Sequence, residues 1–402
     1  MRIALFPDDY LPDSTLVHAK MFHELALELK GRGHTPIIIT PGKPNQSERL
    51  VVDVIDGIEI WRFKNGYTRG VGKVNRAINE SLISWNAWRA ISSRVKRDHF
   101  DLCINYSPTI FFGPLVSWIK KTCACPVYLI LRDIFPQWVI DEGLIKERSL
   151  IARYFRYFER LNYRNATKIG LMSDKNIQYF LEKNPQSYDL EVLRNWADLD
   201  PYSVDRDSPS LKKEHHWNDK VVFFYGGNIG HSQDTENLLR LARNLKSDSR
   251  AHFLFVGQGD EVELLLKKQT EWGLDNVTYW PSVSQEEFKK LLTQIDVGLF
   301  SLSRHHKTHN FPGKLLGYMV ESKPMLGSVN SGNDLIELVN DSNAGIVHVN
   351  GEDEKLMQSA RNILDSEDYR KMLGNNGYQL LCREFSVGAI ASQLLSITEG
   401  TQ

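Results

Sequence analysis

The chain has 402 residues, of which 42% are hydrophobic and 25% are charged, and its formal net charge is −1. This length is too great for one hydrophobic core and predicts two domains of ordinary size. The near-neutral charge disfavours a general nucleic-acid binder, and no apolar run approaches the ~20 residues of a membrane-spanning helix.

The cysteines show no metal-ligand spacing along the chain. They are Cys103, Cys123, Cys125 and Cys382. Buried, reduced thiols and a cytoplasmic setting are therefore expected. Met1 and Arg2 lead directly into an apolar run, so we expect no signal peptide.

The chain opens with an alternation of strand and helix. The apolar run Ile3–Phe6 is followed by a turn-rich loop that contains Asp13, Ser14 and Thr15, then by an amphipathic helix and the strand Pro36–Thr40. Such a unit builds a parallel sheet, and its first loop is where doubly wound sheets bind ligands. Ser14 and Thr15 could equally cap the helix.

A charged pair follows a later strand of the first half. The apolar run Val127–Leu131 delivers Arg132 and Asp133 at its carboxyl end, beside a proline and two aromatic residues. Charged residues at a strand exit are typical of a binding site. A structural ion pair in a packed loop would give the same pattern.

The middle of the first half is basic. Between Lys73 and Arg164 there are 15 Lys and Arg residues against 8 Asp and Glu residues, and Ile151–Tyr163 is rich in aromatic residues. Such a region could sit on anionic lipid headgroups. For the helix Ile151–Tyr163 alone, packing on the sheet with a solvated basic side explains the pattern equally well.

A change in composition marks the domain boundary. The stretch from Pro201 to about Lys213 is rich in Asp, Ser and Pro. We therefore expect a first domain over residues 1–200, a linker over 201–218, and a second domain over 219–377. A C-terminal helix over 378–402 is expected to pack back toward the first domain.

Two glycine loops follow strands of the second half. Val221–Tyr225 runs into Gly226-Gly227-Asn228-Ile229-Gly230-His231, and Ala251–Val256 ends at Gly257-Gln258-Gly259-Asp260. Glycine lets the backbone approach a phosphate closely. The spacing differs from the GxGxxG fingerprint, so each loop alone is a weak signal.

The most informative stretch is His309–Pro324, which reads HNFPGKLLGYMVESKP. Its pattern predicts a helix whose first turn holds Lys314, although a helix N-terminus already carries partial positive charge. An anion held by backbone N–H groups and the lysine ammonium would explain this placement. A surface lysine on an ordinary buried helix is the alternative. The basic loop Arg304-His305-His306-Lys307 lies just upstream.

Taken in order, these motifs resemble the family-4 glycosyltransferases of the GT-B fold over nearly the whole chain. The matching strings of the second half are FFYGGNIGHSQDTENLL, FLFVGQGDEVELL, NVTYWPSV, DVGLFSL and PGKLLGYMVESKP. Those of the first half are PDDYLPDSTLVHAKMFHELA, GRGH, LRDIFPQW and VLRNWAD. The strings DDYLPDSTLVHAKM, LRDIFPQWVID and GLMSDKN are similar to bacterial L-fucosamine transferases of O-antigen assembly.

The resemblance implies an α/β fold of the GT-B type, with two Rossmann-like, doubly wound parallel-sheet domains facing across a cleft. It implies a UDP-sugar donor in the second domain and an undecaprenyl-diphosphate-linked acceptor in the first. The transferred sugar would be N-acetyl-L-fucosamine, in O-antigen, lipopolysaccharide or capsule synthesis. The enzyme would be peripheral at the inner face of the plasma membrane, retaining, and independent of metal or other cofactors.

Site residues are carried over from the family's motifs. The positions expected near the nucleotide sugar are Gly227, Asn228, Gly230, His231, Gly257, Gly259, Arg304, His309, Lys314 and Leu315. Those expected to serve catalysis are Lys314, Arg132 and Asp133. Those expected to bind the acceptor are Asp13, Ser14, Thr15 and His18.

The chain departs from the family at charged positions. His309 and Gly317 stand where many members have two glutamates, and Asn228 and Gln233 stand where many have an Arg and Lys pair. The nearby cations that remain are Lys314, His231 and Arg304. Two alternatives therefore stay open: a GT-B sugar-nucleotide epimerase, and a noncatalytic nucleotide-sugar-binding partner of a polysaccharide assembly complex.

Overall fold

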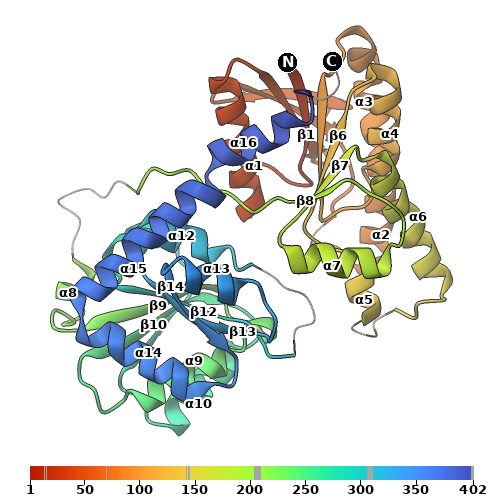
Figure 1. Cartoon of the computed structure of the whole chain (residues 1–402). Helices are drawn as coiled ribbons and strands as arrows, with labels where there is room; N and C mark the ends of the chain where they lie inside the picture. Colours follow the sequence, from red (N-terminus) through yellow and green to blue (C-terminus); the bar gives the residue numbers. More distant parts are fainter. Residues whose placement is uncertain are drawn as a thin grey trace. The chain divides into compact units, whose positions relative to one another are not determined.

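A computed structural model describes residues 1–12, 14, 16–68, 70–141, 143, 145–202, 210–305 and 311–399. The chain divides into two compact units, each an α/β structure on a largely parallel sheet (Figure 1). Unit 1 comprises Met1–Asn195 and Val387–Gln402, and unit 2 comprises Trp196–Ser386. Two parallel-sheet α/β domains were predicted from the sequence, and this fold class is confirmed.

The unit boundaries differ from the expected limits at residues 200 and 377. The Ala197 N–H donates to Phe385 O at 2.9 Å, and Ala197 also pairs with Ser386 in an isolated parallel bridge. These bonds join the first residues of unit 2 to its last residues. The C-terminal stretch therefore belongs to unit 1 only from Val387 onward.

Unit 1 is built on a sheet with the strand order β3-β4-β2-β1-β5-β6-β7-β8. The strands are β1 (Arg2–Phe6), β2 (Thr35–Gly42), β3 (Leu50–Ile55), β4 (Ile58–Lys64), β5 (Leu102–Ser107), β6 (Val127–Leu131), β7 (Lys168–Leu171) and β8 (Leu190–Val192). Neighbours run parallel except β3 and β4, which form an antiparallel hairpin. Its turn residues Asp56 and Gly57 have φ angles of 51° and 72°, as a tight hairpin requires.

Helices cover both faces of this sheet. They are α1 (Val17–Gly31), α2 (Lys73–Ser81), α3 (Ile83–Arg97), α4 (Gly113–Cys123), α5 (Gln137–Asp141), α6 (Leu150–Asn165), α7 (Asp174–Lys183) and α16 (Val387–Ser396). Figure 1 shows α16 beside α1, although they lie at opposite ends of the chain. The Arg32 Nη2 group fixes this contact by donating to Gly388 O at 2.7 Å.

Unit 2 is built on a parallel sheet with the strand order β11-β10-β9-β12-β13-β14. The strands are β9 (Val221–Asn228), β10 (Ala251–Gln258), β11 (Val277–Trp280), β12 (Val297–Ser301), β13 (Met325–Val329) and β14 (Gly345–Val349). In β9, Val222 and Phe224 join one buried cluster, whereas Phe223 and Tyr225 join another. A central strand buried on both faces explains the continuous apolar run that marks it in the sequence.

The helical segments of unit 2 surround this sheet. They are α8 (Leu211–Glu214), the 3₁₀ turn η1 (His231–Gln233), α9 (Thr235–Asn244), α10 (Val262–Glu271), α11 (Gln285–Gln294), α12 (Lys314–Val320), α13 (Leu335–Asp341), α14 (Asp353–Asp365), α15 (Glu367–Leu380) and the π-helical turn η2 (Leu381–Phe385). Helix α12 buries most of its side chains against the sheet.

Each sheet has one point where the strand order reverses. In unit 1 the chain builds outward from β1 to β2 and then continues from β5 on the other side of β1. In unit 2 the same reversal occurs between β9 and β12. Ligands of open α/β sheets bind outside the carboxyl ends of the strands at such a point.

Candidate functional site

The two glycine loops of unit 2 lie side by side at the carboxyl edge of the sheet. Gly227 on β9 pairs with Gly257 on β10, and the Ile229 N–H donates to Gln258 O at 2.8 Å. A Cβ on Gly257 would overlap Gly227 O, and Gly227 has a φ of 110°. Glycine is therefore required at both positions, and the loops keep backbone open for a ligand.

The two residues that replace the family's basic pair contact each other. The Asn228 Nδ2 group donates to Gln233 Oε1 at 2.7 Å. Gly230 lies beside them, because a Cβ there would come 2.7 Å from Asn228 Nδ2. This corner of the site is thus polar, and it also holds the Asp260 carboxylate, whose Oδ1 would lie 2.8 Å from the same Cβ.

Lys314 begins α12 and directs its side chain into unit 2. Its Nζ lies 3.3 Å from the centroid of the Tyr225 ring, is shielded from solvent, and has no hydrogen-bond partner in the part of the chain that the structure describes. Burial lowers the pKa of Lys314 well below its usual value. A buried ammonium with three unused donors is unfavourable unless an anion completes it.

The ring under Lys314 is itself held firmly. Tyr225 is fully buried, and its hydroxyl donates to Asn228 O at 2.6 Å. Burial, with a smaller effect from the Glu261 carboxylate, raises the pKa of Tyr225 above its usual value. Tyr225 thus connects Lys314 to the first glycine loop.

The start of α12 does not present every expected backbone donor. The Leu315 N–H donates to Pro312 O at 3.1 Å, so a diphosphate contact at Leu315 would require this bond to be exchanged. The helix begins at Lys314, as the sequence pattern predicted. Lys314 therefore supplies the clearer anion-binding group at this helix start.

The remaining cations expected near the nucleotide sugar lie around η1. His231 is exposed, and its Nδ1 lies 3.3 Å from Glu261 Oε1. Arg304 is also exposed, and the Ser303 N–H beside it donates to Ser232 O at 2.9 Å. The loop after β12 is therefore joined to the first glycine loop. His309 lies outside the described residues.

In unit 1, Arg132 has a different partner from the expected sugar. Its Nη1 donates to Leu193 O at 2.7 Å and its Nη2 donates to Arg194 O at 3.0 Å. Burial lowers the pKa of Arg132 to about 10. These two nitrogens thus fix the segment after β8, which favours a positioning role, whereas the buried Nε of Arg132 has no hydrogen-bond partner among the described residues.

Asp133, by contrast, reaches solvent at the carboxyl edge of the sheet. Protein atoms crowded around it, together with the Asp8 carboxylate, raise the pKa of Asp133, and Arg132 partly offsets this. Asp8 follows β1, which borders the strand-order reversal of unit 1, and Asp133 follows β6, the strand next to β5, so both lie at the same carboxyl edge of the sheet.

His18, one of the residues expected to bind the acceptor, contacts both Asp8 and Tyr106. Its Nε2 lies 3.1 Å from Asp8 Oδ1, and its ring centroid lies 5.4 Å from that of Tyr106 on β5. Ser14 does not cap α1, because the residue at the cap is Leu16; the Ser14 Oγ instead accepts from the Leu16 N–H at 3.3 Å. Asp13 and Thr15 lie outside the described residues.

Sequence reasoning missed three residues of these sites: Asp8, Tyr106 and Tyr225. Asp8 stands directly in the loop after the first strand, and this position could have identified it. Tyr106 and Tyr225 lie inside strands, where an aromatic residue ordinarily signals only core packing. Their roles depend on neighbours from other elements.

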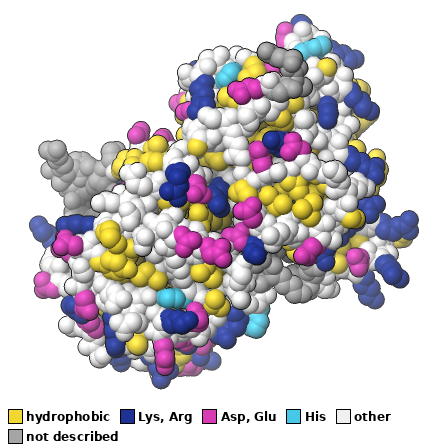
Figure 2. Space-filling model, viewed as in Figure 1, with side chains coloured by type: hydrophobic (Ala, Val, Ile, Leu, Met, Phe, Trp, Pro, Cys, Tyr) yellow, Lys and Arg dark blue, Asp and Glu magenta, His cyan; other side chains and the backbone are white. Residues whose placement is uncertain are grey.

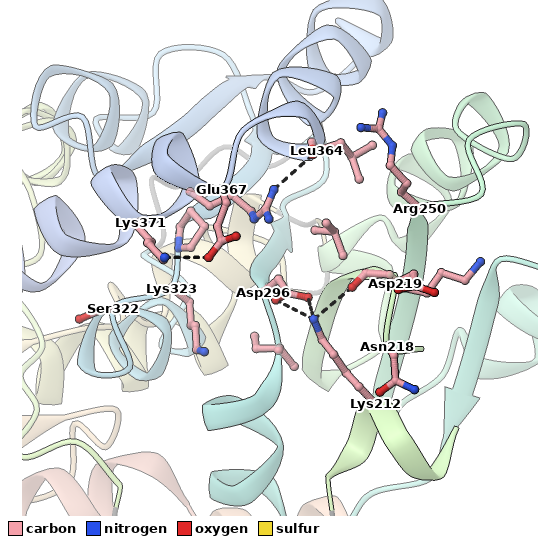
Figure 3. A pocket seen from close by; sticks show the side chains of 15 residues that line it. Lys212, Asn218, Asp219, Arg250, Asp296, Ser322, Lys323, Leu364, Glu367 and Lys371 are labelled. Carbon is pink, nitrogen blue, oxygen red and sulfur yellow. Dashed lines mark hydrogen bonds and ion pairs between the residues drawn. The ribbon is translucent and has the colours of Figure 1, made fainter. Parts of the chain in front are cut away.

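A cavity of about 550 Å³ lies elsewhere in unit 2 (Figure 3). It lies at the amino ends of the strands, beside Val221, Asp296 and Pro324. One of the lysines that line it, Lys212, is paired with Asp296 at 2.7 Å. The cavity is therefore on the opposite edge of the sheet from the glycine loops and does not coincide with the candidate site.

Two further properties concern the described residues only. Among them, no group of three or more His, Cys, Asp or Glu side chains gathers closely enough to hold a metal ion. None of the helices among these residues combines the length and apolar character needed to cross a membrane.

Solved structures resemble the chain over its full length. Sucrose-phosphate synthase from Thermosynechococcus elongatus matches with a TM-score of 0.74 at 13% identity, covering 100% of this chain and 98% of that chain. Anabaena HepE, described in complex with UDP and glucose, matches with a TM-score of 0.68 at 14% identity, covering 100% of both chains. These likenesses establish the GT-B fold.

Two curated relatives share a higher sequence identity with the chain but match a smaller share of it. A Pseudomonas aeruginosa protein named as a glycosyltransferase, WbjE, is 25% identical over 54% of this chain and 54% of its own length, so the match spans about half of that relative. WcaI of Escherichia coli (strain K12), named as a colanic acid biosynthesis glycosyl transferase, is 24% identical over 78% of this chain and 80% of its own length.

Two family models match in succession. Residues 18–196 match the glycosyl transferase 4-like domain, and residues 207–380 match the glycosyl transferases group 1. The two matches fall on unit 1 and unit 2 in turn. Each half of the chain therefore matches a glycosyltransferase family model, and the whole chain has the GT-B fold.

Proposed function

We propose that the chain transfers a sugar from a UDP-sugar bound by unit 2 to a lipid-linked glycan bound by unit 1. The observation that carries this proposal is the buried Lys314 Nζ, which lacks a partner among the described residues and lies beside the paired glycine loops. UDP as the nucleotide is supported by HepE, which is described in complex with UDP and glucose.

Lys314 would bind the diphosphate of the donor and stabilise the charge that develops on UDP as the glycosidic bond breaks. A preorganised cation in a water-poor site is effective in this role, and losing one such contact costs about 10²–10³-fold in turnover. Because protein cations neutralise the leaving group in this scheme, we propose that transfer is independent of metal. Arg304 would add to the positive field from the exposed side of η1, where the His231 ring also faces the nucleotide sugar in this proposal.

Unit 1 would bind the acceptor at the carboxyl ends of β1, β5 and β6. Asp133 and the Asp8–His18 pair would contact the reacting sugars there, while Arg132 positions the segment after β8. The proposed acceptor is an undecaprenyl-diphosphate-linked glycan, and the proposed sugar is N-acetyl-L-fucosamine. Family 4 membership, retention of anomeric configuration and action at the inner face of the plasma membrane complete the proposal.

Donor binding and transfer should be tested separately. Calorimetry with UDP-, GDP- and dTDP-sugars on the full chain should show binding of a UDP-sugar, and Lys314→Met should weaken it. Transfer is then measured with that donor and an undecaprenyl-diphosphate-linked acceptor. Binding of no nucleotide sugar would overturn the proposal. Binding without transfer would leave a noncatalytic partner, and conversion of the free donor without acceptor would indicate an epimerase.

A further inference from the structure

Unit 1 exposes an apolar stripe along α2 and the start of α3. Four side chains of this stripe are between 43% and 73% exposed: Val74, Ile78, Leu82 and Trp85. Their spacing of three or four residues places them on one side of the helical path. A nine-residue helix is marginal in water without a packed apolar face, and here that face is turned to solvent.

Helix α6 exposes a second stripe. Its members are between 43% and 80% exposed: Leu150, Ile151, Tyr154 and Tyr157. The opposite side of α6 buries Ala152 and Tyr163 against unit 1. The helix is thus anchored in the fold and still leaves two aliphatic and two aromatic side chains uncovered.

The two stripes adjoin. The Tyr154 hydroxyl on α6 donates to Ser81 Oγ at the end of α2 at 2.7 Å. We call the eight exposed side chains of the two stripes the apolar patch. An exposed apolar area of this kind marks an interaction surface.

Positive charge surrounds the apolar patch. The exposed basic residues of α2, α3, α6 and the segment before α6 are Arg76, Arg89, Lys96, Arg97, Lys146, Arg148, Arg153, Arg160 and Arg164. Of the acidic residues there, Glu80 and Glu159 are each paired with an arginine at 2.8 Å, and Glu147 is exposed between Lys146 and Arg148. Figure 2, viewed as in Figure 1, shows Lys and Arg side chains gathered along the side of unit 1 where α4 and α6 lie.

We propose that the apolar patch is the surface by which unit 1 docks on an anionic lipid bilayer. Its aliphatic side chains enter the acyl boundary, its tyrosines and Trp85 take the interfacial level, and the surrounding arginines meet lipid phosphates. Charge complementarity selects lipid as the occupant, because the apolar side chains lie within a basic rim. The inference rests on the proposed function, since a lipid-linked acceptor is reached at a bilayer surface.

Vesicle flotation of the full chain tests this docking. Vesicles of phosphatidylcholine alone are compared with vesicles that also contain phosphatidylglycerol. We expect binding to the anionic vesicles that weakens with salt. The triple variant Ile78→Glu, Trp85→Glu, Ile151→Glu should lose about tenfold or more of this binding. Arg153→Glu with Arg160→Glu should remove mainly the preference for anionic lipid.

Matched controls come from exposed apolar residues elsewhere. Leu266→Glu on α10 and Val54→Glu on β3 replace side chains that are 43% and 67% exposed, and both should bind vesicles as the unmodified chain does. Unchanged circular dichroism and thermal midpoints would establish that the variants fold. Equal vesicle binding by the triple variant and the controls would overturn the docking surface, as would no vesicle binding at all.

Light scattering tests whether a second copy of the chain, and not lipid, covers the apolar patch. A dimer that the triple variant dissociates would mean that the apolar patch is an interface between chains, and would overturn lipid docking. Donor binding measured by calorimetry without vesicles reports on the proposed function independently. Vesicle binding that depends on the patch, in a chain that binds no nucleotide sugar, would leave the docking surface standing and remove the proposed function.

Discussion

The Lys314 Nζ atom lies 3.3 Å from the centroid of the Tyr225 ring, where its only described interaction is with the ring face. A cation over an aromatic ring gains some stabilisation, but the ring cannot replace the hydrogen bonds that the ammonium makes in water. The ligand-free protein therefore keeps a destabilising group at the edge of the sheet where unit 2 would bind an anion.

Replacing Lys314 by methionine should stabilise the ligand-free protein. Methionine has a similar shape and no charge to desolvate, so we expect a gain on the order of 1–3 kcal/mol in the free energy of unfolding. Because the folded-state pKa of Lys314 is lowered, the unfolded chain binds the extra proton. The unmodified protein should gain stability as pH rises between that lowered pKa and the usual value. Denaturation at several pH values should show this slope in the unmodified protein and a smaller one in Lys314→Met.

Binding of a UDP-sugar should take up a proton. A diphosphate next to Nζ favours the charged amine and returns the pKa of Lys314 toward its usual value. Affinity should therefore fall as pH rises between the pKa of the free protein and that of the complex. Calorimetry in buffers of different ionisation enthalpy measures the uptake directly. Lys314→Met should abolish it, and uptake that persists in this variant would contradict the assignment.

Restoring positive charge beside the first glycine loop should strengthen donor binding. Asn228 and Gln233 now satisfy each other across 2.7 Å without a net charge. The double variant Asn228→Arg, Gln233→Lys offers the diphosphate charge-assisted hydrogen bonds worth about 1–2 kcal/mol, or roughly tenfold in Kd. The neutral variant Asn228→Ala, Gln233→Ala is the control. Equal affinity in the two double variants would argue that this corner does not face the diphosphate.

Arg132→Met should destabilise unit 1. It leaves Leu193 O and Arg194 O without their buried donor, which we expect to cost about 2–4 kcal/mol. Thermal unfolding should detect the loss, whereas calorimetry at moderate temperature should find donor binding nearly unchanged. A fully stable Arg132→Met protein that has lost transfer would instead favour direct contact with substrate.

The rate of transfer should fall as the pH is lowered and Asp133 takes up a proton. The pKa of Asp133 is raised by crowding and by Asp8, so an ionised carboxylate is lost at a higher pH than usual. Asp8→Asn removes one cause and should move the acid limb of the pH–rate profile to lower pH. Asp133→Asn should lower turnover strongly at every pH. An acid limb that Asp8→Asn leaves in place would show that another group controls it.

The sequence predicted the positions of the main elements well. Val127–Leu131 was expected as a strand and is β6 with the same bounds, because a strand buried on both faces leaves a continuous apolar run. The start of α12 at Lys314 was likewise foreseen from Pro312 and Gly313. Local pattern was sufficient in both cases.

Contacts between distant residues could not be predicted in this way. Two nitrogens of the Arg132 guanidinium donate to backbone carbonyls 61 and 62 residues away, and a carbonyl oxygen leaves no trace in residue type. The Tyr225 ring beneath Lys314 looked like an ordinary core residue of its strand. Site geometry depends on how strands are ordered in the sheet, which residue patterns within one segment do not specify.

The attachment of α16 to α1 has a consequence for biosynthesis. Besides the Arg32 contact, the Gln393 Nε2 group donates to Val192 O at 2.8 Å, so α16 is held by both ends of the segment that unit 1 contributes from Met1 to Asn195. During synthesis this segment emerges before unit 2, but unit 1 cannot complete its fold until the residues after Ser386 have also emerged. Unit 2, which is continuous in sequence, can close earlier. The unit that is begun first is completed last.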